Sequence, residues 1–300
     1  MQPRVSLSRS LNQPRIPASR NGLDIQPRVI IARVLVYSIL VGWLVISLFP
    51  FYWMFVSSFT PVAQIFTFPP VLLPAHPTIE NYQRLPVLIP TLARNALNSL
   101  VLALFTPMAT VFFSSLAGYA FAKFRFHGQR VLFALVIFTQ LIPPAAGFIP
   151  LFIQMVQFKL IDTLWALFLP GVVSAFGIFL FRQTIRSVPD ELLDAARIDG
   201  ASSFKIYRSI VIPLVMPMVI TQYILGFIAS WNDYLWPLIA MRTPPNFTLP
   251  VAMASIQGLM FDSPWGAIMA GAVLLTIPSI IIFIVLSRYI VPDLTSGAFK

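Results

Sequence analysis

Six long runs of apolar residues, separated by polar or proline-rich segments, constrain the fold of this chain more than any other feature. The runs have about 18 residues or more, close to or above the length that an α-helix needs to cross the hydrocarbon core of a membrane. Of the 300 residues, 58% are hydrophobic and 10% are charged, whereas soluble domains carry about 25% charged residues. The sequence therefore predicts an all-α integral membrane protein with six transmembrane helices.

The positions of the runs predict how the chain is organised. A tail at 1–29 precedes a first transmembrane helix at 30–59 and an extracytoplasmic loop at 60–94, whose seven prolines exclude a regular spanning helix. A transmembrane core over 91–290 and a tail at 291–300 follow. The expected elements of the core are helices at about 95–122, 131–157, 164–186, 211–240 and 265–288, and a short helix at about 189–201.

Prolines and small residues set the expected packing of these helices. Pro143 and Pro144 are expected to break the helix over 131–157, because proline leaves backbone groups that neighbours or water must satisfy. Small residues around Gly118 predict that another helix packs closely against the second span.

The distribution of lysine and arginine predicts the orientation in the membrane. With the N-terminus inside, sixteen of the twenty basic residues fall in inner segments, and four, Arg84, Arg94, Lys159 and Arg242, fall in outer ones. Cytoplasmic loops carry such an excess, so both termini are expected in the cytoplasm. Residues 1–28 lack the apolar segment of a cleavable signal peptide and are expected to form a disordered tail.

Composition also argues against several kinds of site. The chain has no cysteine, and its two histidines, His76 and His127, belong to no ligand cluster, so we expect no metal centre. The net charge of +10 comes from basic residues spread over several loops, which argues against nucleic-acid binding. The sequence has no Gly-x-x-x-x-Gly-Lys-Ser/Thr loop to bind ATP phosphates, so we expect no cofactor and no catalytic residue in this chain.

One polar segment, Pro189–Ala201, stands out between the apolar runs. It holds four of the ten carboxylates of the chain and cannot lie in lipid, so it is expected to project into the cytoplasm. A proline in the first turn, followed by acidic residues, favours a helix start, and Gly200 favours its end. Ser202 is then expected to cap a following helix.

The helical period divides this segment into two faces. One face is small and apolar and the other is mostly charged: Leu192, Leu193, Ala195 and Ala196 form the first, and Asp190, Glu191, Asp194, Arg197 and Ile198 the second. Three interpretations are open, namely a helix that docks in a groove of a partner, a helix that lies on lipid headgroups, and a solvated loop. The acidic face argues against the second, because cytoplasmic leaflets are usually anionic.

The same segment resembles the EAA motif of permease subunits of bacterial ABC importers. The usual pattern is Glu-Ala-Ala, then Asp-Gly-Ala, then a hydrophobic residue and proline; here Asp194 replaces the leading glutamate and Pro213 stands at the expected spacing. The resemblance implies a cytoplasmic coupling helix that contacts an ATPase subunit, and Arg197 can pair with Asp190, Asp194 or that partner. The residues implied in this contact are Glu191, Asp194, Ala195, Ala196, Arg197, Asp199, Gly200 and Ala201.

Other segments resemble the smaller, six-helix permease of the maltose-type, carbohydrate-uptake subfamily. They are Tyr52–Phe59, Glu80–Tyr82, Ala117–Phe126, Ile142–Pro143, Ser230–Pro237 and Gly297–Lys300. The resemblance implies the type I ABC importer permease fold, N-in and C-in, in a bacterial plasma (inner) membrane. It also implies a second homologous permease subunit, an ATPase dimer that binds ATP and Mg²⁺, and an extracytoplasmic solute-binding protein that contacts the outer loop at 241–263.

The function implied is that of a permease subunit of an ATP-driven importer of sugars or related polyols and glycosides. Candidates for the substrate path are Gln140, Ser230, Trp231, Asn232 and Asp233. Trp231 offers a ring that can stack on a sugar, and Asp233 fits either the path or the membrane interface. An ion-coupled carrier or channel without an ATPase is the alternative, but no charged residue lies near the centre of an expected helix, where such proteins usually carry one. The residues do not exclude a membrane scaffold without transport.

Overall fold

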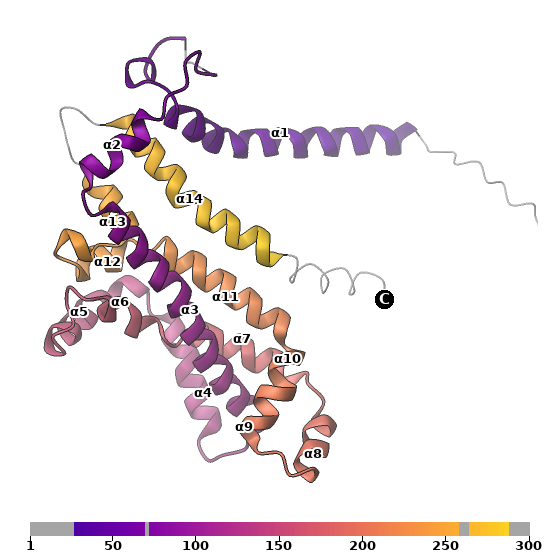
Figure 1. The fold of residues 1–300 in the computed structure, drawn as a ribbon. Coiled ribbons are helices and arrows are strands. Elements are labelled where there is room, and N and C mark those ends of the chain that lie inside the picture. The colour runs from indigo at the N-terminus through magenta and orange to yellow at the C-terminus, as the bar shows by residue number, and fades with distance from the viewer. Residues whose placement is uncertain (1–26, 70–71, 258–263, 288–300) are drawn as a thin grey trace, which may run out of the picture. The chain divides into compact units, whose positions relative to one another are not determined.

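The computed structural model describes residues 27–69, 72–257 and 264–287. Residue contacts divide the chain into two compact units, Met1–Pro50 and Phe51–Lys300. Within the described ranges the chain forms helices and no strand, as the sequence predicts (Figure 1). α1 spans Pro27–Ser58; the remainder of the N-terminal tail and all of the C-terminal tail lie outside the described residues.

α1 agrees with the first span predicted at 30–59. Its last turn belongs to the second unit and is fastened there by α2 (Glu80–Leu88), a helix inside the proline-rich loop. The buried side chain of Asn81 donates hydrogen bonds to the carbonyl oxygens of Ser58, at 3.0 Å, and Thr60, at 2.9 Å. These bonds satisfy backbone carbonyls that the end of a helix leaves without partners.

The second unit is built around α3, which packs along α7 and α11. Figure 1 shows α8 near the carboxyl end of α3 and α13 near its amino end. The helices after α2 are, in chain order, α3 (Leu92–Lys123), α4 (Gln129–Phe138), α5 (Phe148–Gln157), α6 (Leu164–Gly171), α7 (Ala175–Arg186), α8 (Asp190–Ile198), α9 (Ser203–Ile206), α10 (Ile212–Leu214), α11 (Met216–Trp231), α12 (Leu235–Ala240), α13 (Leu249–Ser255) and α14 (Trp265–Ser287).

The crossing of α3 and α7 depends on the small residues around Gly118. A β-carbon at Gly118 would lie 2.6 Å from Cβ of Phe181 and 2.9 Å from the backbone nitrogen of Arg182, so glycine alone fits without a shift of α7. Ser114 and Ser115, one turn earlier, are also buried. The predicted close packing against the second span is confirmed, and the helix that packs there is α7.

The third and fourth runs are both interrupted. α4 and α5 are separated by short 3₁₀ turns on either side of Pro143, and the two halves meet at 101°, so the predicted break is confirmed. Over 164–186 the chain forms two successive helices, α6 and α7, rather than the one expected, although together they remain one candidate span. The hydroxyl group of Ser174 accepts a hydrogen bond from the N–H of Gly177 at 3.1 Å and starts α7 anew.

The prediction of one helix over 211–240 is wrong. α9 is followed directly by a π-helical segment, Tyr207–Val211, and by α10. The helix is interrupted at Val215, and the axis of α11 makes an angle of 81° with that of the preceding segment, Ser203–Leu214. Pro217 has no N–H to donate to the carbonyl oxygen four residues earlier, which removes one hydrogen bond of the helical ladder at this bend. A second break, after α11, separates α12.

By length and hydropathy, four helices in the described ranges are able to cross a membrane, and the two bent pairs raise the number to at most six. The expected six spans therefore require that each bent pair counts as one span. α14 agrees with the helix predicted at 265–288 as far as Ser287.

Replacement of Gly118 with alanine tests the crossing of α3 and α7. The added methyl group meets backbone atoms of α7, which cannot rotate away, so we expect a loss of about 1–3 kcal/mol of stability. Gly147→Ala is the matched control, because a β-carbon there meets nothing within 4 Å. The thermal unfolding midpoint of the purified protein should fall for Gly118→Ala alone; equal midpoints for both variants contradict the assigned crossing.

Candidate functional site

α8 confirms the helix predicted in the polar segment 189–201, and the predicted residues set its ends. Pro189 has φ −59°, which suits a helix start, and two acidic residues occupy the first turn. Gly200 follows the helix with φ +76°, a value that other residues rarely adopt. The hydroxyl group of Ser202 accepts a hydrogen bond from the N–H of Lys205 at 3.3 Å and so caps α9.

The small, apolar arc of α8 is divided between the protein interior and the solvent. Leu193 is 1% exposed and packs in an apolar cluster with residues of α3, α7 and α9, and Ala196 is half-buried beside it. Leu192, Ala195 and Ile198 are exposed, Ile198 by 87% of its surface, and we call these three the exposed face of α8. Ile198 lies one turn after both Asp194 and Ala195, so the exposed face borders the charged residues of α8. An apolar surface on a short solvated helix is typical of a docking site.

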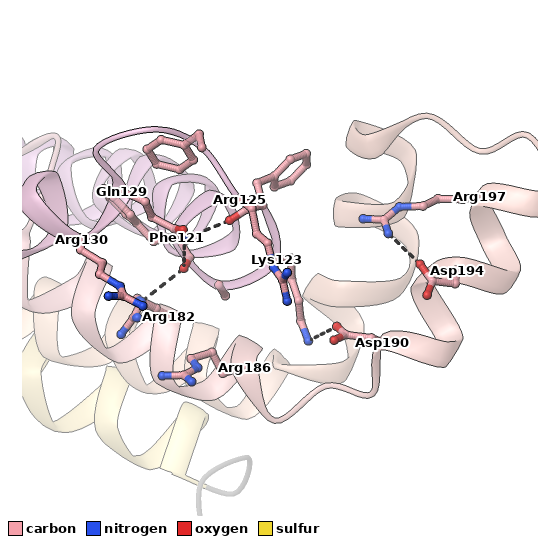
Figure 2. A pocket seen from close by; sticks show the side chains of 13 residues that line it. Phe121, Lys123, Arg125, Gln129, Arg130, Arg182, Arg186, Asp190, Asp194 and Arg197 are labelled. Carbon is pink, nitrogen blue, oxygen red and sulfur yellow. Dashed lines mark hydrogen bonds and ion pairs between the residues drawn. The ribbon is translucent and has the colours of Figure 1, made fainter.

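A buried lysine fastens the start of α8 to the end of α3. The ammonium group of Lys123 lies 2.7 Å from a carboxylate oxygen of Asp190 and donates to the carbonyl oxygen of Val188 at 2.5 Å (Figure 2). The Lys123 side chain is only 5% exposed, so these acceptors replace the water it has lost. The hydrogen bond from Lys123, and then its charge, hold the pKa of the Asp190 carboxyl below its ordinary value. The sequence gives little sign of this role beyond one basic residue at the end of an apolar run.

A second ion pair lies within α8. Of the three partners open to Arg197, the structure selects Asp194, at 2.7 Å and one turn earlier. Both side chains are well exposed, so the pair contributes about 0.5 kcal/mol or less to the helix. Glu191 and Asp199 are exposed and form no ion pair with any described residue, which leaves both carboxylates available to a partner.

The candidates for the substrate path lie beside the two broken helices. Gln140 is exposed in the 3₁₀ turn after α4. Trp231 is 3% exposed, and its indole N–H donates to a backbone carbonyl of α14 at 2.8 Å, so its ring is covered in this structure. Asn232 and Asp233 are exposed in the break after α11, and Ser230 is half-buried.

Near the amino end of α3, side chains fix the segment 242–247, the start of the loop predicted on the outer side. Asp162 accepts hydrogen bonds from the N–H groups of Arg242 at 2.9 Å and Thr243 at 3.1 Å, and from the Thr243 hydroxyl at 2.7 Å. Asn95 and Asn98 donate to carbonyl oxygens of the same segment, over distances of 2.8 to 3.0 Å. The sequence does not single out these three polar residues, because their partners are remote along the chain.

Known proteins match both the sequence and the fold. A family model described as a binding-protein-dependent transport system inner membrane component matches residues 110–296. The chain belongs to this family. The arabinooligosaccharides transport system permease protein AraQ of Bacillus subtilis is 39% identical to it over 68% of this chain and 72% of that protein. The trehalose transport system permease protein SugB of Mycobacterium tuberculosis is 34% identical over 85% of this chain and 93% of that protein.

A solved structure agrees with this family. One chain of a bacterial ABC transporter involved in the import of the acidic polysaccharide alginate matches with a TM-score of 0.79 and 26% identity, over 86% of this chain and 96% of that chain. The protein is therefore a multi-pass inner-membrane permease subunit of a binding-protein-dependent ABC importer, which works with a second permease and with separate ATPase subunits. The resemblance based on the EAA segment is confirmed, and nothing supports the alternative of a carrier without an ATPase.

Asp162 is expected to hold the outer loop over a wide pH range. Burial alone raises the pKa of its carboxyl, but the hydrogen bonds from Arg242 and Thr243 outweigh burial and place the pKa below the ordinary 3.8. A lowered pKa stabilises the fold above the ordinary value, and the effect is lost only as the pH falls through the lowered value. Hydrogen exchange over 241–247, corrected for its intrinsic pH dependence, should be equal at about pH 5 and about pH 7.

Asp162→Ala tests the same loop by removing both carboxylate oxygens. The backbone N–H groups of Arg242 and Thr243, which both donate to Oδ1 of Asp162, then lose their acceptor. Exchange over 241–247 is expected to speed up about tenfold. Glu80→Ala, which removes another exposed carboxylate, serves as the control, and unchanged exchange in Asp162→Ala argues against the role of this residue.

Proposed function

We propose that this permease imports sugars or related polyols and glycosides. The support is that AraQ and SugB are named for arabinooligosaccharides and trehalose, and that the similarity to SugB covers 85% of this chain. The related solved structure belongs to an importer of a polysaccharide. Carbohydrate is the chemistry that all three share.

Force from the ATPase reaches the permease through α8. The observation that carries this proposal is the exposed face, Leu192, Ala195 and Ile198, on a helix whose opposite side is held by Leu193 and Lys123. Burial of three apolar side chains in a cleft of the ATPase stabilises the contact, and the exposed carboxylates beside them provide its polar rim.

The remaining residues of the motif have a different role from the exposed face. Ala196 and Ala201 pack against the permease, Gly200 forms the turn after α8, and Asp194 pairs with Arg197. They shape and orient the helix, so their substitution acts on coupling through the position of the exposed face. ATP and Mg²⁺ bind to the ATPase subunits, and this chain contributes no catalytic group.

Six spans with both termini in the cytoplasm complete the proposed topology. Each bent pair then counts as one span, and the excess of basic residues on one side supports this orientation. The segment 241–247 at the outer end of α3 is the surface proposed for the solute-binding protein. Gln140, Ser230, Asn232 and Asp233 are the polar groups proposed for the path, with Trp231 as a support behind them.

Ala195→Arg tests the docking of α8. Position 195 is exposed, so the substitution leaves the packing of the permease intact but places a charged, bulky side chain in the middle of the exposed face. We expect the ATPase subunits to be lost during purification, and ATP-driven uptake to fall at least about tenfold. Ser187→Arg adds the same side chain at an exposed position before the helix and should leave both unchanged. Full uptake by the Ala195→Arg variant would exclude this face as the contact.

The absence of cysteine allows a direct test of orientation. Ser187→Cys and His76→Cys each introduce the only thiol of the chain, at exposed positions assigned to the inner and outer sides. In intact cells a membrane-impermeant maleimide is expected to label His76→Cys alone, and permeabilised cells should label both. Labelling of Ser187→Cys in intact cells reverses the proposed orientation.

A further inference from the structure

A basic cavity of about 680 Å³ lies where the adjoining ends of α3, α4 and α7 meet α8 (Figure 2). Six cations and two carboxylates line it, and the two carboxylates are already paired with Lys123 and Arg197. The other four cations of the lining have no ion pair among the described residues: Arg125, Arg130, Arg182 and Arg186. The cavity thus holds more positive charge than the described part of the chain neutralises.

The arginines are arranged around one space. Figure 2 shows Arg130, Arg182 and Arg186 together on one side of the cavity, with Lys123 and Arg125 across from them. Arg182 is fixed, because its Nε–H donates to the carbonyl oxygen of Phe121 at 3.3 Å and its guanidinium carbon lies 4.0 Å from the ring centroid of a phenylalanine of α4. Like charges gathered in this way repel one another unless an anion lies between them.

An apolar groove continues from this cavity along α3. The cavity shares Phe124–Phe126 with a groove of about 480 Å³, and this groove shares Phe204 and Tyr207 with a further one of about 450 Å³. Together they follow α3 from Ala120 to Met108, a rise of about 18 Å from the membrane surface toward its middle. A charged head and an apolar tail of this length are the chemistry of a phospholipid.

We propose that the cavity binds the phosphate headgroup of an anionic phospholipid, whose acyl chain lies in the apolar groove. Arginine binds phosphate through two parallel N–H···O bonds, and basic pockets between helices on the cytoplasmic side suit such headgroups. A free phosphate binds the arginines but leaves the groove uncovered, so the continuity of the two favours the lipid. The site relies on the proposed orientation and goes beyond the coupling and transport roles.

The lipid site has a consequence for α8. Asp190 and Asp194 line the same cavity as the free arginines, so a bound phosphate lies beside the junction of α3 with α8. The phosphate, with its one negative charge, reduces the repulsion among the four arginines and leaves the two carboxylates to Lys123 and Arg197. Anionic lipid is thus expected to hold α8 in the position from which it contacts the ATPase.

Arg130→Gln and Arg186→Gln, singly and together, test the site, since both side chains are exposed and lie outside the proposed ATPase contact. The complete transporter, purified through a tag on this chain, is titrated with palmitoyl-oleoyl phosphatidylglycerol or phosphatidylcholine, and bound lipid is counted by native mass spectrometry. We expect the wild type to prefer phosphatidylglycerol, and its affinity to fall about fivefold for each charge removed. Lys205→Gln, a cytoplasmic cation outside cavity and groove, should leave the affinity unchanged.

Three results overturn the proposal. The first is equal affinity of the double variant and the wild type for phosphatidylglycerol. The second is competition by the water-soluble headgroup glycerophosphoglycerol at the same concentration as the lipid, which indicates an anion site without a lipid tail. The third is loss of the ATPase subunits from the double variant with lipid binding intact, which assigns the cavity to an acidic segment of the ATPase. Ala195→Arg separates this proposal from the coupling role, because it should lose the ATPase and keep the lipid.

Discussion

The ion pair between Lys123 and Asp190 joins the membrane helices to the one helix that leaves them. Lys123 is the last residue of α3 and Asp190 the first of α8, and the lysine side chain is almost fully buried. A buried ammonium group without a partner costs free energy. The start of α8 therefore cannot move away from α3 unless Lys123 becomes exposed to water or loses its ion pair. Leu193, one turn later, is buried on the same side. α8 is therefore fixed to the membrane helices, as its proposed coupling role requires.

Beyond α8 the chain is held for a short distance and then bends. The hydroxyl groups of Ser115 and Tyr207 lie 2.7 Å apart in the interior and tie the π-helical segment to α3. At Val215 the hydrogen-bond ladder loses one bond, since Pro217 offers no donor, and α11 leaves at 81°. Bends of this kind occur where prolines or π-helical turns interrupt a helix. The part of the chain that is fixed to α8 therefore ends at Val215, where the direction of the helix changes.

The sequence predicts those features that depend on local composition and fails where distant residues decide. α1, α3 and α14 agree with the expected spans, and α8 begins and ends where proline and glycine indicate. The helix expected over 211–240 is broken, because the effect of its prolines depends on how the flanking helices pack. Lys123 and Asp162 were not predicted, because their partners lie 67 and 80 residues away in the chain. Leu192 shows the same limit, because helical period groups it with Leu193 but the protein covers only Leu193.

α3 is one helix that holds a neighbouring segment at each of its two ends. Asn95 and Asn98 hold the segment 244–247 near its amino end, and Lys123 holds α8 at its carboxyl end, about 42 Å from Asn95 along the helix axis. α3 packs along α7 and α11 and cannot change its length, so a shift at either end is shared by the other. Under the proposed contacts, a binding protein at the segment 241–247 and an ATPase at α8 act on the same helix. Each favours the arrangement of helices in which its own contact is best made, and coupling between the two sides follows from that shared element.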